Sequence, residues 1–360
     1  MRILILANDS GGLYNFRKEL IAELLKKKNK VSAYTPNGGF VEELDKLGCK
    51  VNDLHLDRRG IDPRKDIKLF LSLCKIVSQE KPDLVITYTI KPNIYGSMVC
   101  RLKKIPYAVN ITGLGTAFQQ QGFLRTMVTT MYRFALKKAK TVFFENSENM
   151  QLFVNKRIIC KKQAKLLNGA GVNLDRFSLL PYPKDCEEIR FLFMGRVMAE
   201  KGVDELFAAM RNLQNDNVKC SLDMLGSFDE NYAAKIKTAE DEGWLRYHGV
   251  QADVRPFINN CHCFVLPSYH EGMANTNLEC ASSGRPVITS NIHGCLEAVE
   301  DGVTGYLVES KNSDNLYQVM KEFTKLSYEE RKAMGLAGRK RMENVFDKKK
   351  VVAETITGLE

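Results

Sequence analysis

The segment Cys263-Phe-Val-Leu-Pro-Ser-Tyr-His-Glu-Gly-Met-Ala-Asn-Thr-Asn-Leu-Glu-Cys-Ala-Ser-Ser283 contains an apolar run, a polar loop and a helical pattern in succession. The run at 263–267 predicts a short buried strand, and residues 277–283 predict a helix soon after it. A buried strand that leads into a helix is the repeating unit of a parallel sheet covered on both faces. The segment therefore predicts an α/β fold.

The same alternation occurs in two separate series along the chain. The first series predicts strands at 3–7, 31–34, 51–54, 84–88, 107–110 and 141–144, and helices at 13–28, 40–47, 63–79, 93–102 and 124–138. The second predicts strands at 191–194, 220–225, 245–248, 263–267 and 287–289, helices at 203–212, 231–240 and 277–283, and a charged helical tail at 327–357. Glycine and proline residues between 168 and 184 mark the boundary between the two series.

This order of elements predicts a two-domain protein. We expect two Rossmann-like, doubly wound domains at 1–168 and 169–335, which face a central cleft where ligands bind at the carboxyl ends of the strands. We expect a C-terminal helix at 336–360 to pack back on the N-terminal domain. The length of 360 residues and the 44% hydrophobic content suit two cores of this kind.

The cysteines and the apolar runs bear on the compartment. The ten cysteines are scattered without a C-x-x-C pair, which is usual for a protein of the reducing cytoplasm. The tightest group, Cys261-His262-Cys263, lacks zinc spacing, so we interpret it as part of a buried strand. The apolar run that ends at Ala7 is too short for a signal peptide, and no run reaches the roughly 18 residues of a membrane span.

Charge is distributed unevenly between the two halves. Residues 1–168 hold 30 Lys and Arg against 14 Asp and Glu, a net charge of +16. Residues 169–360 hold 23 against 29, a net charge of −6. The basic half predicts an anionic partner such as membrane lipid, a phosphorylated acceptor or nucleic acid. A solvated, lysine-rich exterior is the alternative.

Residues 271–279 form a loop and helix start suited to a ligand. Gly272 allows close approach to the backbone, and the N–H groups near Ala274–Thr276 would attract a phosphate at the helix N-terminus. Glu271 is suited to a sugar, and Glu279 to ribose hydroxyls. The alternative is structural, because Thr276 and Glu279 have the spacing of a capping box, in which Glu279 only caps the helix.

The segment Gly195-Arg-Val-Met-Ala-Glu-Lys-Gly202 follows the predicted strand at 191–194. Arg196 and Lys201 therefore lie at the carboxyl end of that strand. Two cations at this position can neutralise a diphosphate and stabilise it as a leaving group. The alternative is two solvated cations, with Lys201 paired to Glu200.

The glycine-flanked Arg196 and Lys201, together with Glu271 and Glu279, resemble the family 4 glycosyltransferases, which are retaining enzymes of the GT-B architecture. Three further segments match the family in its order: Asn-Gly-Ala-Gly-Val-Asn-Leu-Asp-Arg-Phe at 168–177, Ser-Gly-Arg-Pro-Val-Ile at 283–288 and Glu-Ala-Val-Glu-Asp-Gly-Val-Thr-Gly-Tyr-Leu-Val at 297–308. The resemblance covers nearly the whole chain and implies a hexosyltransferase that uses a nucleotide-sugar as donor substrate and no cofactor.

Two N-terminal segments resemble a narrower set of enzymes. Tyr-Thr-Ile-Lys-Pro-Asn-Ile-Tyr-Gly at 88–96 and Asn-Ile-Thr-Gly-Leu-Gly-Thr-Ala-Phe at 110–118 are similar to transferases that build bacterial surface glycans. This resemblance implies transfer of a hexose or N-acetylhexosamine from a UDP-sugar to an undecaprenyl-diphosphate-linked saccharide, for capsule, exopolysaccharide, O-antigen or protein-glycan synthesis. It implies a cytoplasmic enzyme, peripheral on the inner face of the cytoplasmic membrane.

Carried over by position, the family resemblance assigns roles to individual residues. Arg196 and Lys201 would hold the donor diphosphate, Glu271 the transferred sugar and Glu279 the ribose; the first three form the expected catalytic set. The remaining donor-side residues it implies are Gly11, Gly12, Gly195, Val250, Gly272, Met273, Ala274 and Asn275. Gly11 and Gly12 would close over the phosphates, and the loop with Val250 would cradle the base. The two cations do the work of a metal, so none is expected.

The chain departs from the family at one position. Many members place a histidine of the N-terminal domain near the reacting sugar carbon, but no histidine lies between residues 56 and 247 here. Thr112 and Gly113 occupy that region and are expected on the acceptor side, and His270 beside Glu271 is another candidate. A front-face mechanism, in which a leaving phosphate oxygen deprotonates the acceptor, needs no protein base and is our hypothesis for retention.

The segment 124–138 predicts a cationic amphipathic helix suited to an anionic membrane surface, and the loop 58–65 adds four cations. An ordinary core-facing helix is the alternative. Competing functions are an epimerase or phosphorylase of the same architecture, and a non-catalytic protein that binds sugar or nucleic acid. No RNP-type strand, zinc knuckle or helix-turn-helix is recognisable, so we expect no nucleic acid partner.

Overall fold

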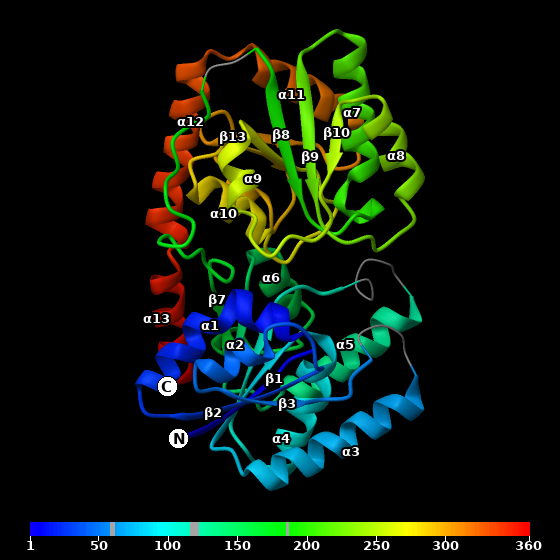
Figure 1. Cartoon of the computed structure of the whole chain (residues 1–360). Coiled ribbons are helices and arrows are strands. Elements are labelled where there is room, and N and C mark those ends of the chain that lie inside the picture. Colours follow the sequence, from blue (N-terminus) through cyan, green and yellow to red (C-terminus); the bar gives the residue numbers. More distant parts are fainter. Residues whose placement is uncertain (58–61, 116–121, 185–186) are drawn as a thin grey trace. The chain divides into compact units, whose positions relative to one another are not determined.

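The computed structural model describes residues 1–57, 62–115, 122–184 and 187–360, which form two α/β units (Figure 1). Unit 1 comprises residues 1–170 and 348–360, and unit 2 comprises residues 171–347. The predicted C-terminal helix at 336–360 is therefore divided between the units: residues 336–347 belong to unit 2, and only the last thirteen residues belong to unit 1.

The sheet of unit 1 has seven parallel strands in the order β3-β2-β1-β4-β5-β6-β7. The strands are β1 Arg2–Leu6, β2 Lys30–Thr35, β3 Lys50–Asp53, β4 Leu84–Tyr88, β5 Tyr107–Ile111, β6 Thr141–Phe144 and β7 Ala164–Leu166. The helices are α1 Ser10–Lys26, α2 Val41–Lys46, α3 Pro63–Glu80, the π-turn η1 Pro92–Gly96, α4 Ser97–Lys103, α5 Phe123–Leu136, α6 Ser147–Asn155, the 3-10 turn η3 Lys161–Gln163 and α13 Lys348–Leu359.

Helices cover both faces of this sheet. Successive side chains of a strand point to opposite faces, and β1 shows both layers. Ile3 and Ile5 belong to a core formed with α1, α2 and α13, whereas Leu4 and Leu6 belong to a core formed with α3, α4, α5 and α6. Unit 1 is therefore doubly wound, as the sequence predicts.

Unit 2 has six parallel strands in the order β10-β9-β8-β11-β12-β13. The strands are β8 Ile189–Met194, β9 Cys220–Leu225, β10 Leu245–Tyr247, β11 Cys263–Leu266, β12 Val287–Ser290 and β13 Gly305–Val308. The helices and helical turns are η4 Ala199–Lys201, α7 Val203–Asn215, α8 Ala233–Asp241, α9 Arg255–Asn260, α10 Asn275–Ser282, η5 Leu296–Ala298, α11 Ser313–Lys325, α12 Tyr328–Arg341 and η6 Met342–Phe346. Strand order reverses between β8 and β11, which is where doubly wound sheets bind ligands.

The two segments that join the units are hydrogen-bonded to each other just inside unit 2. Val172 donates its backbone N–H to the carbonyl of Phe346 at 2.8 Å, and Val172 forms a parallel bridge with Asp347. The predicted tail helix at 327–357 is wrong as a single helix, because it ends near this point and restarts at Lys348.

The Gly-Arg-Pro motif at 284–286 has a structural role. Arg285 is completely buried, and its guanidinium donates to five carbonyl groups at 2.8–3.4 Å. The accepting residues are Pro181, Ile258, Asn259, Ser283 and Gly284. Only a planar group with five donors can satisfy this many acceptors at once, so Arg285 fastens α9 and the segment before β8 to the start of β12.

The group Cys261-His262-Cys263 is buried, as expected for a strand, and all nine described cysteines are free. His262 Nδ1 accepts the backbone N–H of Arg190 at 3.0 Å, so its ring connects β8 to the residue that precedes β11. Burial, together with the nearby Arg190 and Arg331, lowers the pKa of His262 to about 4.

Among the described residues, no helix combines the length and the apolar composition needed to span a bilayer.

Candidate donor-binding site

Two loops meet at the carboxyl edge of the unit 2 sheet, one after β8 and one after β11. These strands are neighbours in the sheet, on either side of the reversal in strand order. The loops pack so closely at Gly202 that a Cβ there would lie 2.1 Å from the carbonyl oxygen of Pro267. Gly202 also has φ +70°, a conformation that glycine adopts without strain. Glycine at this position therefore brings Lys201 against the loop that carries Glu271.

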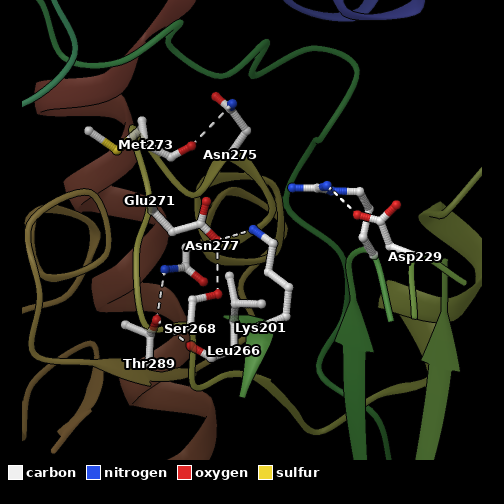
Figure 2. A network of polar contacts seen from close by, with 10 residues as sticks. Lys201, Asp229, Leu266, Ser268, Glu271, Met273, Asn275, Asn277 and Thr289 are labelled. Carbon is white, nitrogen blue, oxygen red and sulfur yellow. Dashed lines mark hydrogen bonds and ion pairs between the residues drawn. The ribbon is translucent and has the colours of Figure 1, made fainter. Parts of the chain in front are cut away.

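Lys201 and Glu271 form an ion pair at the centre of this edge (Figure 2). The hydroxyl of Ser268 donates to the same carboxylate oxygen at 2.8 Å. The two side chains are only 15% and 12% exposed, so little water screens the pair. Lys201 thus pairs with Glu271 and not with Glu200, which corrects the alternative that the sequence left open. The ammonium still has donors for an anion, since Lys has three N–H groups.

Arg196 lies at the same edge and pairs with a second loop. Its Nη1 donates to Asp229 at 2.6 Å, and the guanidinium is half exposed. Glu230, next along that loop, accepts the backbone N–H of Ala199 at 2.8 Å. The two carboxylates hold the loop after β8 in place while the guanidinium keeps an exposed side.

The N-terminus of α10 faces the loop that carries Glu271. The helix begins at Asn275, its N-cap is Ala274, and no side chain caps it. The structural alternative, a capping box formed by Thr276 and Glu279, is therefore wrong, because the helix begins before Thr276. Uncapped N–H groups and the helix dipole favour an anion at this end. Glu279 lies one turn further along and is partly exposed.

Neighbouring groups hold this helix start in place. Asn277 donates to the hydroxyl of Thr289 at 3.1 Å, and that hydroxyl donates to the carbonyl of Leu266 at 2.8 Å (Figure 2). Ala274 donates its N–H to the carbonyl of Gly294 at 2.7 Å. These bonds connect α10 to both neighbouring strands, β11 and β12.

The remaining predicted donor-side residues of unit 2 lie on the same sheet edge but differ in their contacts and burial. Gly195 directly follows β8, and its carbonyl oxygen would be 1.7 Å from a Cβ at Gly226, so the loops after β8 and β9 also touch. Gly272 and Asn275 flank the start of α10, whereas the Met273 side chain is buried in the core. Val250 is 73% exposed in the loop after β10.

The predicted residues of unit 1 lie after the carboxyl ends of β1 and β5. Gly11 and Gly12 are in the first turn of α1, not in a loop, because Asp9 caps the helix by accepting the N–H of Gly12 at 2.8 Å. Thr112 and Gly113 follow β5 and are partly exposed. Residues 116–118 of the N-terminal motif lie outside the described residues.

Tyr269 supports the loop just before Glu271. Tyr269 donates its hydroxyl to Glu205 at 2.6 Å and its N–H to the carbonyl of Glu200 at 2.8 Å. Burial and the bond to Glu205 raise the pKa of Tyr269. His270 Nε2 is buried and lacks a hydrogen-bond partner among the residues that the structure describes.

Sequence reasoning missed Ser268 and Asp229, whose partners are the predicted Glu271 and Arg196, and Glu230, which holds the loop after β8 through Ala199. Ser268 directly follows the strand predicted at 263–267, and this position could have marked it as a candidate. Nothing local marks Asp229 or Glu230, because their loop meets the site only through the sheet order. Within the described ranges, no three His, Cys, Asp or Glu side chains gather as metal ligands do.

Two family models match the chain, one in each half. Residues 2–146 match the model for "Glycosyl transferase 4-like", and residues 181–341 match the model for "Glycosyl transferases group 1". Together with the two parallel sheets, these matches define a glycosyltransferase of the GT-B class. The chain belongs to the glycosyltransferases with a 4-like N-terminal domain and a group 1 C-terminal domain.

Curated relatives come from pathways of bacterial surface and lipid-linked glycans. An N,N'-diacetylbacillosaminyl-diphospho-undecaprenol alpha-1,3-N-acetylgalactosaminyltransferase of Campylobacter jejuni is 26% identical over 332 residues, 88% of this chain and 87% of the relative. A UDP-Gal:alpha-D-GlcNAc-diphosphoundecaprenol alpha-1,3-galactosyltransferase of Escherichia coli is 26% identical over 74% of this chain and 72% of the relative. The capsular polysaccharide biosynthesis glycosyltransferase CapM of Staphylococcus aureus is 24% identical over 90% of this chain and 88% of the relative.

Solved structures confirm the fold at lower sequence identity. Anabaena HepE in complex with UDP and glucose has a TM-score of 0.80 at 15% identity, covering 99% of both chains. Sucrose-phosphate synthase of Thermosynechococcus elongatus also has a TM-score of 0.80, at 18% identity over 99% of this chain and 98% of the neighbour.

Proposed function

We propose that this glycosyltransferase moves a hexose or an N-acetylhexosamine from a UDP-sugar to a saccharide carried on undecaprenyl diphosphate, with retention at the anomeric carbon and without a metal. The product would enter capsule, exopolysaccharide, O-antigen or protein-glycan synthesis. The observation that carries the donor half is the meeting of Arg196, Lys201 and the N-terminus of α10 at one sheet edge.

The donor diphosphate would bind at this edge. An uncapped helix end and two cations with spare donors provide three sources of positive potential for its oxygens. Glu271, which holds Lys201 from the side, would accept hydroxyl groups of the sugar, and Glu279 those of ribose. The cations perform the charge neutralisation that a metal would otherwise supply, which supports the metal-independent proposal.

The reaction would proceed on one face of the sugar. The bond between the anomeric carbon and the diphosphate oxygen breaks, and the acceptor oxygen bonds to the same carbon from the same side. The departing phosphate oxygen takes the proton of the acceptor hydroxyl, so UDP leaves with the balancing proton and no protein base is needed. Lys201 and Arg196 stabilise the charge that develops on the leaving oxygen.

The acceptor half of the proposal rests on the relatives. The enzymes of Campylobacter jejuni and Escherichia coli are both named for undecaprenol-diphosphate acceptors, and both extend over most of this chain. The strongly basic N-terminal half suits an acceptor that carries a diphosphate.

Nucleotide binding gives the first test. UDP, GDP, ADP and CMP would be added without metal to the wild type, to Glu279→Ala, and to Glu322→Ala, an exposed control on α11. We expect UDP alone to stabilise the wild type and the control, by about 2.7 kcal/mol at a hundredfold excess over Kd. Loss of this effect in Glu279→Ala supports the ribose role, and equal shifts with all four nucleotides contradict a UDP donor.

Turnover tests the chemistry. With a UDP-sugar and a lipid-linked acceptor, Lys201→Ala should lose nearly all transfer, whereas His270→Ala should lose little. The reverse pattern would count against the front-face hypothesis and in favour of His270 as a catalytic residue.

A further inference from the structure

A groove with a volume of about 580 Å³ lies along α5 in unit 1, next to the end of α6. Its lining includes Arg125, Thr126, Thr129, Thr130 and Arg133 of α5, with Lys156 from the end of α6. Every charged side chain among its described lining residues is a cation, and the threonines add hydroxyl groups. This composition favours an anion with several oxygens, such as a phosphate.

Among the residues that the structure describes, no carboxylate neutralises the cations of the groove. Arg133 donates Nη2 to the carbonyl of Lys156 at 3.0 Å, which connects α5 to the end of α6. Arg125 Nε is buried and has no hydrogen-bond partner among the described residues. Within the same described part of the chain, Arg125, Arg133 and Lys156 form no ion pair with a carboxylate. Their positive potential is therefore available to a ligand.

Large apolar side chains stand beside the groove on the same helix. Phe123 is 85% exposed and Phe134 is 51% exposed. They are eleven residues apart, close to three full turns, so they lie on one side of α5, opposite the buried Val128 and Tyr132. Arg101 of α4 stacks over the Phe134 ring at 4.1 Å, so a cation accompanies the exposed aromatic ring.

The neighbouring helices continue this pattern. Helices α3, α4 and α5 follow one another on the same face of the unit 1 sheet (Figure 1). Among the described helices of unit 1, every exposed large apolar side chain lies on one of these three. Ile67 and Leu71 on α3 and Leu102 on α4 are exposed among Lys and Arg side chains. The helices α1, α2 and α13 on the other face carry no exposed large apolar side chain among their cations.

We propose that the α3–α5 face docks on a bilayer that contains anionic phospholipid, with a lipid phosphate in the α5 groove. Cations near an anionic leaflet attract it electrostatically, and exposed aromatic and aliphatic side chains enter the interface between headgroups and acyl chains. A soluble phosphate would account for the groove but not for the apolar residues around it. The inference rests on the proposed function in one respect, because it places the enzyme on a membrane that carries its lipid-linked acceptor.

Vesicle flotation with the full-length protein tests the proposal. The vesicles contain phosphatidylcholine alone, or phosphatidylcholine with phosphatidylglycerol. The variants are Arg125→Gln/Arg133→Gln in the groove and Phe123→Ser/Phe134→Ser beside it. Lys26→Gln/Lys46→Gln removes the same charge from α1 and α2, the helices on the opposite face of the sheet, and is the matched control.

We expect the wild type and the control to bind the anionic vesicles alike. The groove variant should bind them about 30-fold more weakly, since each cation near the surface contributes roughly a factor of five. The phenylalanine variant should lose on the order of tenfold. Equal binding by the groove variant and the control would overturn the proposal. Binding of inorganic diphosphate by the wild type without vesicle binding would also overturn it, in favour of a soluble phosphate site.

Thermal stabilisation by UDP, measured on the same samples, separates this inference from the proposed function. All variants should keep the wild-type shift, because none of the substituted residues belongs to the predicted donor site. If UDP stabilises no sample while vesicle binding follows the expected order, the donor assignment fails and the docking surface stands. If the groove variant alone loses the UDP shift, it is misassembled; vesicle binding retained by Arg125→Lys/Arg133→Lys then supports the proposal, and its loss there contradicts it.

Discussion

The ion pair between Lys201 and Glu271 is the residue-scale feature on which the donor site depends. Each partner is mostly shielded from water, so removal of one leaves the other charge poorly compensated. We expect Lys201→Met and Glu271→Gln each to lower the free energy of unfolding by about 1–3 kcal/mol. The double variant should lose less than the sum of the two, while transfer activity stays lost.

Urea unfolding of the four proteins measures this coupling. The exposed pair Lys237–Asp241 on α8 has a comparable distance, 2.6 Å, and is the control. Its coupling energy should stay below about 0.5 kcal/mol. Coupling at Lys201–Glu271 no larger than in this control would show that the pair does not organise the site.

The buried His262 leads us to expect that the stability of the protein depends on pH. Its pKa is lowered to about 4 in the folded protein, mainly by burial, against an ordinary value near 6.5. Stability from the neutral ring is therefore complete above pH 6.5 and is lost as pH falls from 6.5 to 4. Between pH 8 and pH 5 we expect a loss of about 2 kcal/mol from this residue.

The measurement is urea unfolding at a series of pH values. His262→Asn keeps an acceptor for the N–H of Arg190 but does not titrate, so its stability should fall less steeply over the same range. His55→Asn at an exposed position controls for the loss of a histidine. Identical pH profiles for the wild type and His262→Asn would contradict the assignment.

At the scale of elements, Gly202 joins the loops after β8 and β11. Gly202→Ala would place a Cβ 2.1 Å from a backbone oxygen at positive φ, so the loop must move. Gly243 also has positive φ, at +85°, but nothing lies within 4 Å of its Cβ position. Gly243→Ala should cost about 1–2 kcal/mol, and Gly202→Ala at least about 2 kcal/mol more, with weaker UDP binding. If the two variants lose a similar free energy of unfolding in denaturant, the close contact at Gly202 is not needed for stability.

Most strands could be predicted from the sequence because short apolar runs next to polar loops mark them directly. Helix starts were harder to predict from the sequence, since each depends on the one residue that caps the helix. Asp9 begins α1 at Ser10, three residues before the predicted start. Ala274 replaces Thr276 as the N-cap of α10, because the sheet edge positions that turn. The predicted helix at 93–102 begins as the π-turn η1, which the 3.6-residue periodicity does not reveal.

At the scale of the whole molecule, the two-domain plan and the residues at strand ends could be predicted, because the carboxyl ends of parallel strands share one edge. The partners Asp229 and Glu230 could not, because they are distant in sequence and reach the site through the order of β8 and β9. The exposure of the apolar residues of α3 could not be predicted either. The helical period of a sequence does not show which face of the helix the neighbouring elements leave uncovered.

The last prediction concerns the unfolding of unit 2, followed separately from that of unit 1. Trp244 is the single tryptophan, it belongs to unit 2, and it is buried against Phe207. Its fluorescence therefore reports the unfolding of the unit that carries the donor site. UDP at a hundredfold excess over Kd should raise the stability measured at Trp244 by about 2.7 kcal/mol. Vesicles alone, which would bind unit 1, should leave this tryptophan transition unchanged if the two units unfold independently. A UDP effect seen by circular dichroism but absent at Trp244 would place the nucleotide on unit 1 and contradict the donor assignment.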